Sequence, residues 1–186
     1  MQKIVLASAS PRRKQLLEWA AQEFDVIVSH CPEEAPGKLS PHETAIYIAR
    51  QKALAVLEKV KEDIPVLAAD TIVVCKGRIL GKPKDREEAI HFLELLSGTN
   101  HTVITGVVIR YGKKEISFAD ETIVSFHALS RDQIQFYVEH YKPYDKAGAY
   151  AIQEWIGVIG IKAIQGDFYN VMGLPVSRVM QALSSL

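Results

Sequence analysis

Short apolar runs and longer amphipathic segments alternate along the 186 residues of this chain. The short runs are rich in Val and Ile and lie between turn residues, a pattern that predicts β-strands. The predicted strands cover residues 4–7, 24–29, 66–75, 78–80, 101–110, 115–127 and 156–164. The run at 66–75 is apolar on both faces, which is typical of a strand in the centre of a sheet.

Five segments have apolar residues at helical spacing. Three of them begin with Ser or Asp followed three residues later by Glu or Gln, the spacing of a capping box, at Ser40, Asp85 and Ser130. The predicted helices cover about residues 11–21, 40–61, 85–98, 130–140 and 175–183. Alternating strands and helices predict an α/β protein with a mixed sheet. Because the chain has no repeat or linker, we expect a single domain over residues 1–186, with room for two lobes.

The balance of charges narrows the choice of partners. The chain has 22 Lys and Arg against 22 Asp and Glu, which argues against general binding along nucleic acid. No apolar segment is long enough to span a membrane, and the first residues lack the long apolar core of a signal peptide. We therefore expect a cytoplasmic protein. Cys31 and Cys75 are too few for a disulfide framework or a zinc site.

The first candidate site is residues 8–13, Ser-Ala-Ser-Pro-Arg-Arg, directly after the first predicted strand. Pro11 suits the first position of a helix, and Ser10 its N-cap, with the hydroxyl turned onto free backbone donors. Arg12 and Arg13 then lie in the first turn, where the helix dipole disfavours cations. An anion such as phosphate would complete this arrangement. A capped helix with two solvated arginines is the alternative.

Asp70 is the second candidate, because it interrupts the apolar strand at 66–75. A buried carboxylate is costly unless it is paired or bound to a metal. The functional interpretations of Asp70 are a metal ligand, a general base, or both. The alternative is that the strand ends at Ala69 and Asp70 begins a turn, but the apolar residues 72–74 disfavour it.

Four more residues carry charges that this chemistry needs. Glu33 and Glu34, in the loop after the second predicted strand, either hold a hard cation such as Mg²⁺ together with Asp70 or lie solvated on the surface. Lys52 lies on the apolar face of the second helix, where a lysine either snorkels to the surface or reaches into a cavity. Lys82, in a Gly-Lys-Pro loop, either neutralises phosphate charge or lies solvated on the surface.

Cations for a polyphosphate and carboxylates for a metal together indicate metal-assisted phosphoanhydride chemistry. We expect Asp70 to face the arginines at the start of the first helix, with a metal-loaded triphosphate between them. The chain has neither G-x-x-x-x-G-K-[ST] nor G-x-G-x-x-G, so neither a Walker-type nor a Rossmann-type phosphate site is supported. These patterns do not name the substrate.

Five motifs, in order from the first strand to the last helix, resemble those of the Maf family of nucleotide pyrophosphatases. They are residues 8–13, 69–73 (Ala-Asp-Thr-Ile-Val), 81–83 (Gly-Lys-Pro), 145–150 (Asp-Lys-Ala-Gly-Ala-Tyr) and 173–175 (Gly-Leu-Pro). The resemblance covers essentially the whole chain and is specific as a set. It implies an inosine-triphosphate-pyrophosphatase-like fold, with an elongated mixed β-sheet flanked by helices and a cleft between two lobes.

The resemblance also implies hydrolysis of a nucleoside triphosphate to the monophosphate and pyrophosphate with a divalent cation, Mg²⁺ or Mn²⁺. Asp70 matches the proton acceptor that activates water, and Asp70 with Glu33 matches the metal ligands. The positions that bind phosphate or metal or support catalysis are matched by Ser8, Arg13, Glu33, Lys52 and Lys82. The positions that set base preference are matched by Arg12, Thr71 and Gln153.

Arg, Thr and Gln at those three positions are the pattern of the branch that prefers dTTP and UTP, rather than of the branch associated with 7-methyl-GTP. The resemblance therefore implies an enzyme that removes excess or non-standard pyrimidine triphosphates. Glu154-Trp155 follows Gln153 where relatives often carry a glycine, and the bulk of Trp155 would bear on base selectivity. Family members are linked to inhibition of septum formation, so the alternative is a nucleotide-binding regulator of cell division. A homodimer is implied by family likeness alone.

Overall fold

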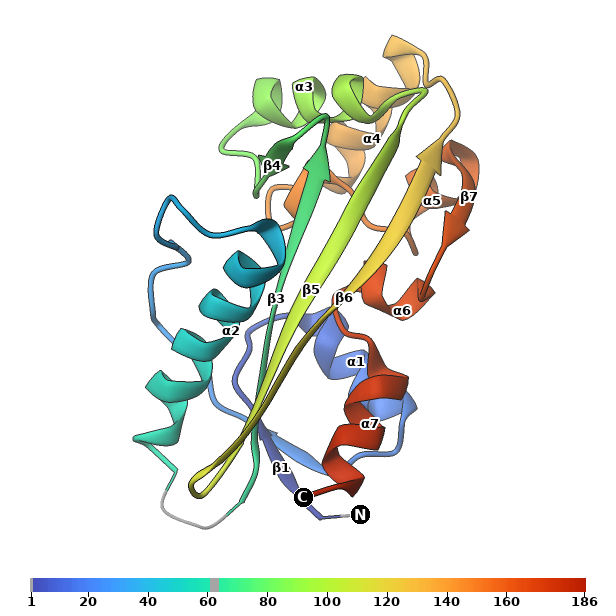
Figure 1. The fold of residues 1–186 in the computed structure, drawn as a ribbon. Coiled ribbons are helices and arrows are strands. Elements are labelled where there is room, and N and C mark those ends of the chain that lie inside the picture. The colour runs from blue at the N-terminus through green and yellow to red at the C-terminus, as the bar shows by residue number, and fades with distance from the viewer. Residues whose placement is uncertain (1, 61–63) are drawn as a thin grey trace. The chain divides into compact units, whose positions relative to one another are not determined.

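The computed structural model describes residues 2–60 and 64–186. The chain forms two compact units, each built from more than one stretch of sequence. Unit 1 contains residues 1–71, 105–120 and 173–186, and unit 2 contains residues 72–104 and 121–172. Three strands therefore run from one unit into the other: β3 (Val66–Cys75), β5 (Asn100–Tyr111) and β6 (Lys114–Phe126) (Figure 1). The single domain over residues 1–186 stays a prediction.

Strands in the described residues form one mixed sheet, in the order β2-β1-β3-β5-β6-β7, with β4 paired to β3. The short strands are β1 (Ile4–Leu6), β2 (Phe24–Val26), β4 (Arg78–Leu80) and β7 (Ile161–Gln165). β1 pairs in parallel with β2 and β3, whereas β4 and β7 pair antiparallel with β3 and β6. The predicted mixed α/β fold is therefore confirmed.

Unit 1 packs helices on its strands through alternating side chains of β1. Its helices are α1 (Pro11–Trp19), α2 (Pro41–Leu57) and α7 (Val176–Ser184). Val5 packs in a cluster with Ala49 and Val56 of α2. Because neighbouring residues of a strand point to opposite faces, Ile4 points away from α2 and lines a small cavity with Met180 of α7. Both faces of β1 are covered, which explains its continuous apolar run.

Gly106 of β5 sets how closely α2 can approach the strands of unit 1. A Cβ atom at this position would lie 2.3 Å from the carbonyl carbon of Ala45 and 2.4 Å from the backbone nitrogen of Ile46. Both atoms belong to the first half of α2, so neither can move without shifting the helix. The absence of a side chain at Gly106 therefore allows α2, the helix that carries Lys52, to pack closely on β5.

Replacing Gly106 with Ala should destabilise the protein by about 3 kcal/mol, at the upper end of the cost of overpacking a core. The clash is with backbone atoms, which cannot rotate away as a side chain would. Urea unfolding of the variant measures the change. The matched control is Gly37→Ala, because a Cβ at Gly37 meets nothing within 4 Å. Equal unfolding free energies for the two variants would contradict the close approach of α2.

Unit 2 contains the remaining helices and the second core. These helices are α3 (Arg86–Leu96), α4 (Arg131–Tyr141), the 3₁₀ turn η1 (Ala147–Ala149), α5 (Trp155–Gly160) and α6 (Phe168–Met172). The capping boxes predicted at Ser40 and Ser130 are both present, and Asp85 accepts from the backbone of Glu88. Leu93 of α3 and Val138 of α4 are fully buried in one cluster with Val124 of β6.

The strand predicted at residues 156–164 is wrong in its first half. Residues 155–160 form helix α5, and β7 begins only at Ile161. A short apolar run in a sequence does not distinguish a buried strand from a helix. Here Gly157 allows the close turn of the backbone that begins the helix. A Cβ at Gly157 would lie 1.8 Å from the carbonyl oxygen of Ile152, so the chain turns where only glycine fits. The strand predicted at residues 24–29 is also shorter, ending at Val26.

The second helix ends at Leu57, before its predicted end at residue 61, which lies outside the described residues. Helix α6 was not predicted, because its five residues are too few to show a helical period. Within residues 2–60 and 64–186, the structure has no helix with both the length and the apolar character to cross a bilayer.

His101 of β5 is a buried, neutral group in unit 2. Its Nε2 lies 2.7 Å from the hydroxyl of Tyr150, its ring meets Phe126 edge-on, and its Nδ1 has no partner among the described residues. Burial lowers the pKa of His101 from its ordinary value of 6.5 to about 4. In the unfolded chain the imidazole gains a proton at about pH 6.5, whereas in the folded protein it stays neutral to about pH 4.

The contribution of His101 to the free energy of unfolding should therefore be fully present above pH 6.5. It should be lost as the pH drops toward 4, which lowers the free energy of unfolding by about 3 kcal/mol. A depressed pKa for a basic group has this sign, because the unfolded state binds the proton first. Urea unfolding between pH 7 and pH 4 measures the loss. His101→Gln keeps a polar partner for Tyr150 and should flatten the curve. An equally steep curve in this variant would assign the acid sensitivity to other groups.

Candidate active site

The site begins at the carboxyl end of β1, where the chain leaves the sheet and enters α1. Pro11 occupies the first turn of α1 and Ser10 its N-cap, as predicted. The predicted capping by the Ser10 hydroxyl is wrong, because the Ser10 side chain makes no capping bond. Instead the backbone N–H of Ser10 donates to the Oγ of Ser8, at 3.2 Å. The side chain of Ser10 therefore makes no hydrogen bond to the free backbone N–H groups at the start of the helix.

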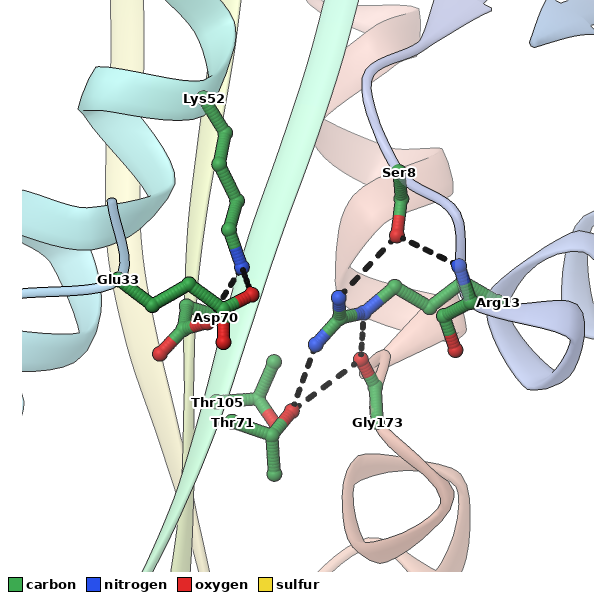
Figure 2. A network of polar contacts seen from close by, with 9 residues as sticks. Ser8, Arg13, Glu33, Lys52, Asp70, Thr71, Thr105 and Gly173 are labelled. Carbon is green, nitrogen blue, oxygen red and sulfur yellow. Dashed lines mark hydrogen bonds and ion pairs between the residues drawn. The ribbon is translucent and has the colours of Figure 1, made fainter. Parts of the chain in front are cut away.

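The guanidinium of Arg13 is held by three hydrogen bonds within unit 1. Its Nε donates to the carbonyl oxygen of Gly173 at 2.7 Å, its Nη1 to Ser8 Oγ at 3.3 Å and its Nη2 to Thr71 Oγ1 at 3.0 Å (Figure 2). Thr71 Oγ1 in turn lies 2.9 Å from the Oγ1 of Thr105. The partners of Arg13 lie in the loop before α1, in β3 and in the segment before α7, so the guanidinium is fixed from several sides.

The guanidinium of Arg13 is buried, with 8% of the residue exposed. Burial lowers the pKa of Arg13, and Asp70 and Glu33 oppose this effect while Arg12 adds to it. Each terminal nitrogen of the guanidinium has a second hydrogen beyond the three bonds described, because the group has five N–H donors. A charged ligand oxygen would match these donors, and it would lower the cost of burying the cation. The alternative of two solvated arginines does not hold for Arg13.

Asp70 lies in the middle of β3 and is buried, as predicted, with 7% of the residue exposed. Its Oδ1 accepts from the Nζ of Lys52 at 2.6 Å, and the same Nζ lies 2.7 Å from Oε1 of Glu33. Lys52 is itself buried and does not snorkel to the surface. The alternative in which β3 ends at Ala69 is excluded, because the strand continues to Cys75. One ammonium group thus joins two carboxylates.

The expectation that Asp70 faces the arginines is wrong for direct contact. Asp70 and Thr71 are neighbours in β3, so their side chains leave the strand on opposite sides. Asp70 meets Lys52 of α2, and Thr71 meets Arg13 of α1 (Figure 2). The two clusters are nevertheless coupled by charge, since Asp70 and Glu33 both raise the pKa of Arg13 against the effect of burial.

Two predicted site residues belong to unit 2, and both side chains are exposed there: Lys82 and Gln153. The Gly-Lys-Pro motif around Lys82 and the segment around Gln153 each contact the motif at residues 145–150 within this unit. The backbone N–H of Gly148 donates to the carbonyl oxygen of Gly81, at 3.0 Å, and Lys146 forms an ion pair with Glu154. The roles of all the predicted site residues, with Lys82, Gln153 and the half-buried Arg12 among them, stay predictions.

The carboxylates of Asp70 and Glu33 fit a hard cation. Both already converge on a single positive charge, the ammonium of Lys52. Among the described residues no group of three or more His, Cys, Asp or Glu side chains gathers as a metal site. Asp70 and Glu33 are the residues that would hold a divalent cation, and the ion would supply positive charge for phosphate oxygens.

Two residues of the cluster were not among the predicted site residues. Thr105 is fully buried in β5, and Gly173 supplies the carbonyl oxygen that accepts from Arg13. Thr105 had a signal in the sequence, because it is a polar residue inside the apolar run at 103–109, as Asp70 is in its own strand. Gly173 lay in a motif of the resemblance, but a role through its backbone oxygen has no mark in the sequence.

Comparison with known proteins decides the family. The family model described as "Maf-like protein" matches residues 3–186. The chain belongs to this Maf-like family. A dTTP/UTP pyrophosphatase of Cytophaga hutchinsonii is 51% identical over 98% of this Maf-like chain and 84% of its own length. A dTTP/UTP pyrophosphatase of Bacillus velezensis is 48% identical over 97% of this chain and 95% of its own.

Among solved structures, the Staphylococcus aureus Ham1 protein has a similar fold, with a TM-score of 0.51 and 16% sequence identity. The match covers 99% of this Maf-like chain and 98% of the Ham1 chain. At this identity the likeness concerns the fold alone. It agrees with the inosine-triphosphate-pyrophosphatase-like class that the motifs implied.

Proposed function

We propose that this protein hydrolyses pyrimidine nucleoside triphosphates, dTTP and UTP above all, to the monophosphate and pyrophosphate. The similar proteins of Cytophaga hutchinsonii and Bacillus velezensis, named dTTP/UTP pyrophosphatases, support this substrate class. The observation that carries the proposal is the arrangement in unit 1, where Asp70, Glu33 and Lys52 form one charged cluster beside the buried Arg13. Cations placed in this way stabilise the negative charge of a phosphoanhydride, and a nearby carboxylate orients and activates the water that cleaves it.

Arg13 binds phosphate oxygens through the donors that the protein leaves to it, and Ser8 keeps the guanidinium turned toward the carboxyl end of β1. Asp70 takes a proton from the attacking water, whose oxygen forms the new bond to phosphorus as the bond to pyrophosphate breaks. Lys52 holds the Asp70 carboxylate in place for this step and offsets the charge of the triphosphate. By family likeness, Lys82 also has a role with phosphate or metal, and this role is part of the proposal.

A divalent cation, Mg²⁺ or Mn²⁺, completes this proposal. Asp70 and Glu33 would hold it, and it would neutralise phosphate charge and make water a stronger nucleophile. The two carboxylates share the single positive charge of Lys52, and the charge of the cation would help to balance the added negative charge of the substrate. The proposal includes a role in clearing surplus or non-standard pyrimidine triphosphates in the cytoplasm, without nucleic-acid or membrane partners and as a homodimer.

A metal-supplemented substrate panel tests the proposed function. The purified protein is given dTTP, UTP, CTP and GTP, with Mg²⁺, with Mn²⁺ or with a chelator, and the products are separated. We expect monophosphate and pyrophosphate from the pyrimidine nucleotides, and loss of this turnover with the chelator. Tight binding of dTTP without hydrolysis would overturn the proposal and favour a nucleotide-binding regulator of cell division.

Arg12→Ala should change the preference among bases more than the affinity for phosphate. Arg12 matches a base-preference position of the family, and it is half-buried in the first turn of α1, next to Arg13. The measurement compares kcat/KM for dTTP, UTP and GTP with the inhibition constant of inorganic pyrophosphate. A uniform loss for all three nucleotides, with an equal loss of pyrophosphate binding, would instead make Arg12 a phosphate ligand.

A further inference from the structure

A chain of two threonine hydroxyls lies behind Arg13 in unit 1. Thr105 Oγ1 lies 2.9 Å from Thr71 Oγ1, which accepts from Arg13 Nη2 at 3.0 Å (Figure 2). Thr105 is fully buried, whereas Thr71 is half-buried. Thr105 precedes Gly106, which faces α2, so Thr105 leaves β5 on the opposite side, toward Thr71 and Arg13.

The orientation of the Thr71 hydroxyl depends on Thr105, because a hydroxyl has a single hydrogen to donate. The Thr71 hydroxyl has one hydrogen, and its oxygen already accepts from Arg13. Its hydrogen can go to Thr105 Oγ1 at 2.9 Å or to the carbonyl oxygen of Gly173 at 3.5 Å. In the first case Thr105 accepts; in the second Thr105 donates to Thr71. In both cases the Thr105 hydroxyl keeps a lone pair of Thr71 aimed at the guanidinium.

Gly173 closes the arrangement from the other end. Its carbonyl oxygen accepts from Arg13 Nε at 2.7 Å, and its φ of 118° belongs to a region that glycine adopts readily. Thr71 and Gly173 thus fix two different nitrogens of one planar group. A guanidinium held at two nitrogens has little freedom to turn, which is what recognition of a phosphate by its remaining N–H groups requires.

We propose that Thr105 is a positioning residue for Arg13, acting through the Thr71 hydroxyl, and that this pair sets the affinity for the triphosphate rather than the choice of base. The inference rests on the proposed function, in which Arg13 binds phosphate. It also changes the role of Thr71. Family likeness matches Thr71 to a base-preference position, but the hydroxyl of Thr71 is engaged by the phosphate-binding arginine.

The test replaces Thr105 with Val, which keeps the branched shape and removes the hydroxyl. We expect kcat/KM to fall about three- to tenfold, the usual effect of losing one hydrogen bond to a buried network. The fall should be the same for dTTP, UTP and CTP, and inorganic pyrophosphate should inhibit more weakly by a similar factor. Thr105→Ser, which restores the hydroxyl, should recover kinetics close to those of the parent protein.

A double-mutant cycle assigns the effect to Arg13. In an Arg13→Ala background, Thr105→Val should have no further effect on kcat/KM, because the group that it positions is gone. An undiminished effect in that background overturns the inference. So does a Thr105→Val variant whose kinetics and pyrophosphate inhibition equal those of the parent, or one that changes the ratio between dTTP and UTP.

Thr122→Val is the matched control for loss of a buried threonine hydroxyl. Thr122 is fully buried in β6, where its hydroxyl donates to the carbonyl oxygen of Asp167 and accepts from Asn170. This variant should have a lower melting temperature and unchanged kinetics. An equal kinetic loss in Thr122→Val would make the effect of Thr105→Val a general one and overturn the inference.

Failure of this inference is distinct from failure of the proposed function. The proposed function fails if the parent protein releases no pyrophosphate, and the phosphate-binding role of Arg13 fails if Arg13→Ala binds inorganic pyrophosphate as tightly as the parent does. Only the role of Thr105 fails if the parent is active and Arg13→Ala is impaired while Thr105→Val behaves as the parent.

Discussion

Asp70→Asn is expected to lower kcat by about 10²- to 10⁴-fold, the contribution typical of a general base. The amide has the size of the carboxylate but cannot take a proton from water. Folding should be retained, because Lys52 keeps its ion pair with Glu33 at 2.7 Å when the charge of Asp70 is removed. Release of pyrophosphate from dTTP, measured under saturating metal, reports the loss.

Glu115→Gln is the matched control for Asp70→Asn. Glu115 is also a carboxylate of unit 1 between two cations, with Arg50 and Arg110 each at 2.8 Å, and these arginines lower its pKa. Loss of this ion pair should leave kcat within about twofold, as for most substitutions outside a site. Near-normal pyrophosphate release by Asp70→Asn would show that another group accepts the proton.

Lys52→Met is expected to destabilise the protein by about 3–5 kcal/mol, the cost of leaving a buried charge without its partner. The side chain of Asp70 is 10% exposed, and Lys52 is the cation that contacts it directly among the described residues. Losing the Lys52 ammonium costs less free energy at Glu33, because 41% of the Glu33 side chain is exposed to water. Unfolding in urea measures the loss, and turnover should be lost as well.

The double variant Lys52→Met, Asp70→Leu separates charge from packing. With the acid also removed, neither member of the Lys52–Asp70 pair is left as an unpaired buried charge, so most of the stability lost in Lys52→Met should return. Activity should not return, since the proposed base is absent. If the double variant is no more stable than Lys52→Met, the loss comes from packing around α2, and the ion pair has little weight in stability.

Much of unit 1 could be predicted from the sequence because each signal there is local. The strand at 66–75 has the same bounds in the structure, and the run of apolar residues on both sides of Asp70 was enough to place that acid in a buried strand. Lys52 on the apolar face of its helix was ambiguous between the surface and a cavity. Only the tertiary contact with Asp70 and Glu33 settles it, because helical periodicity does not say what lies opposite a face.

The errors occurred where a side-chain contact overrides local preference. Ser10 looked like the cap of α1, but Ser8 accepts from the Ser10 backbone N–H, and the Ser10 hydroxyl makes no capping bond. The direct pairing of Asp70 with the arginines failed for a simpler reason. Which cation meets which face of a strand depends on where α1 and α2 pack, and the sequence carries no signal for that choice.

The residues that hold Arg13 also have a particular place in the chain. Thr71, Thr105 and Gly173 are each the last or first residue of unit 1 at a point where the backbone enters or leaves unit 2. Their neighbours Ile72, Ile104 and Met172 belong to the other unit. Under the proposed function, substitutions at those three apolar positions are expected to shift the backbone that carries Thr71, Thr105 and Gly173, and so to change phosphate affinity while every residue around Arg13 is kept.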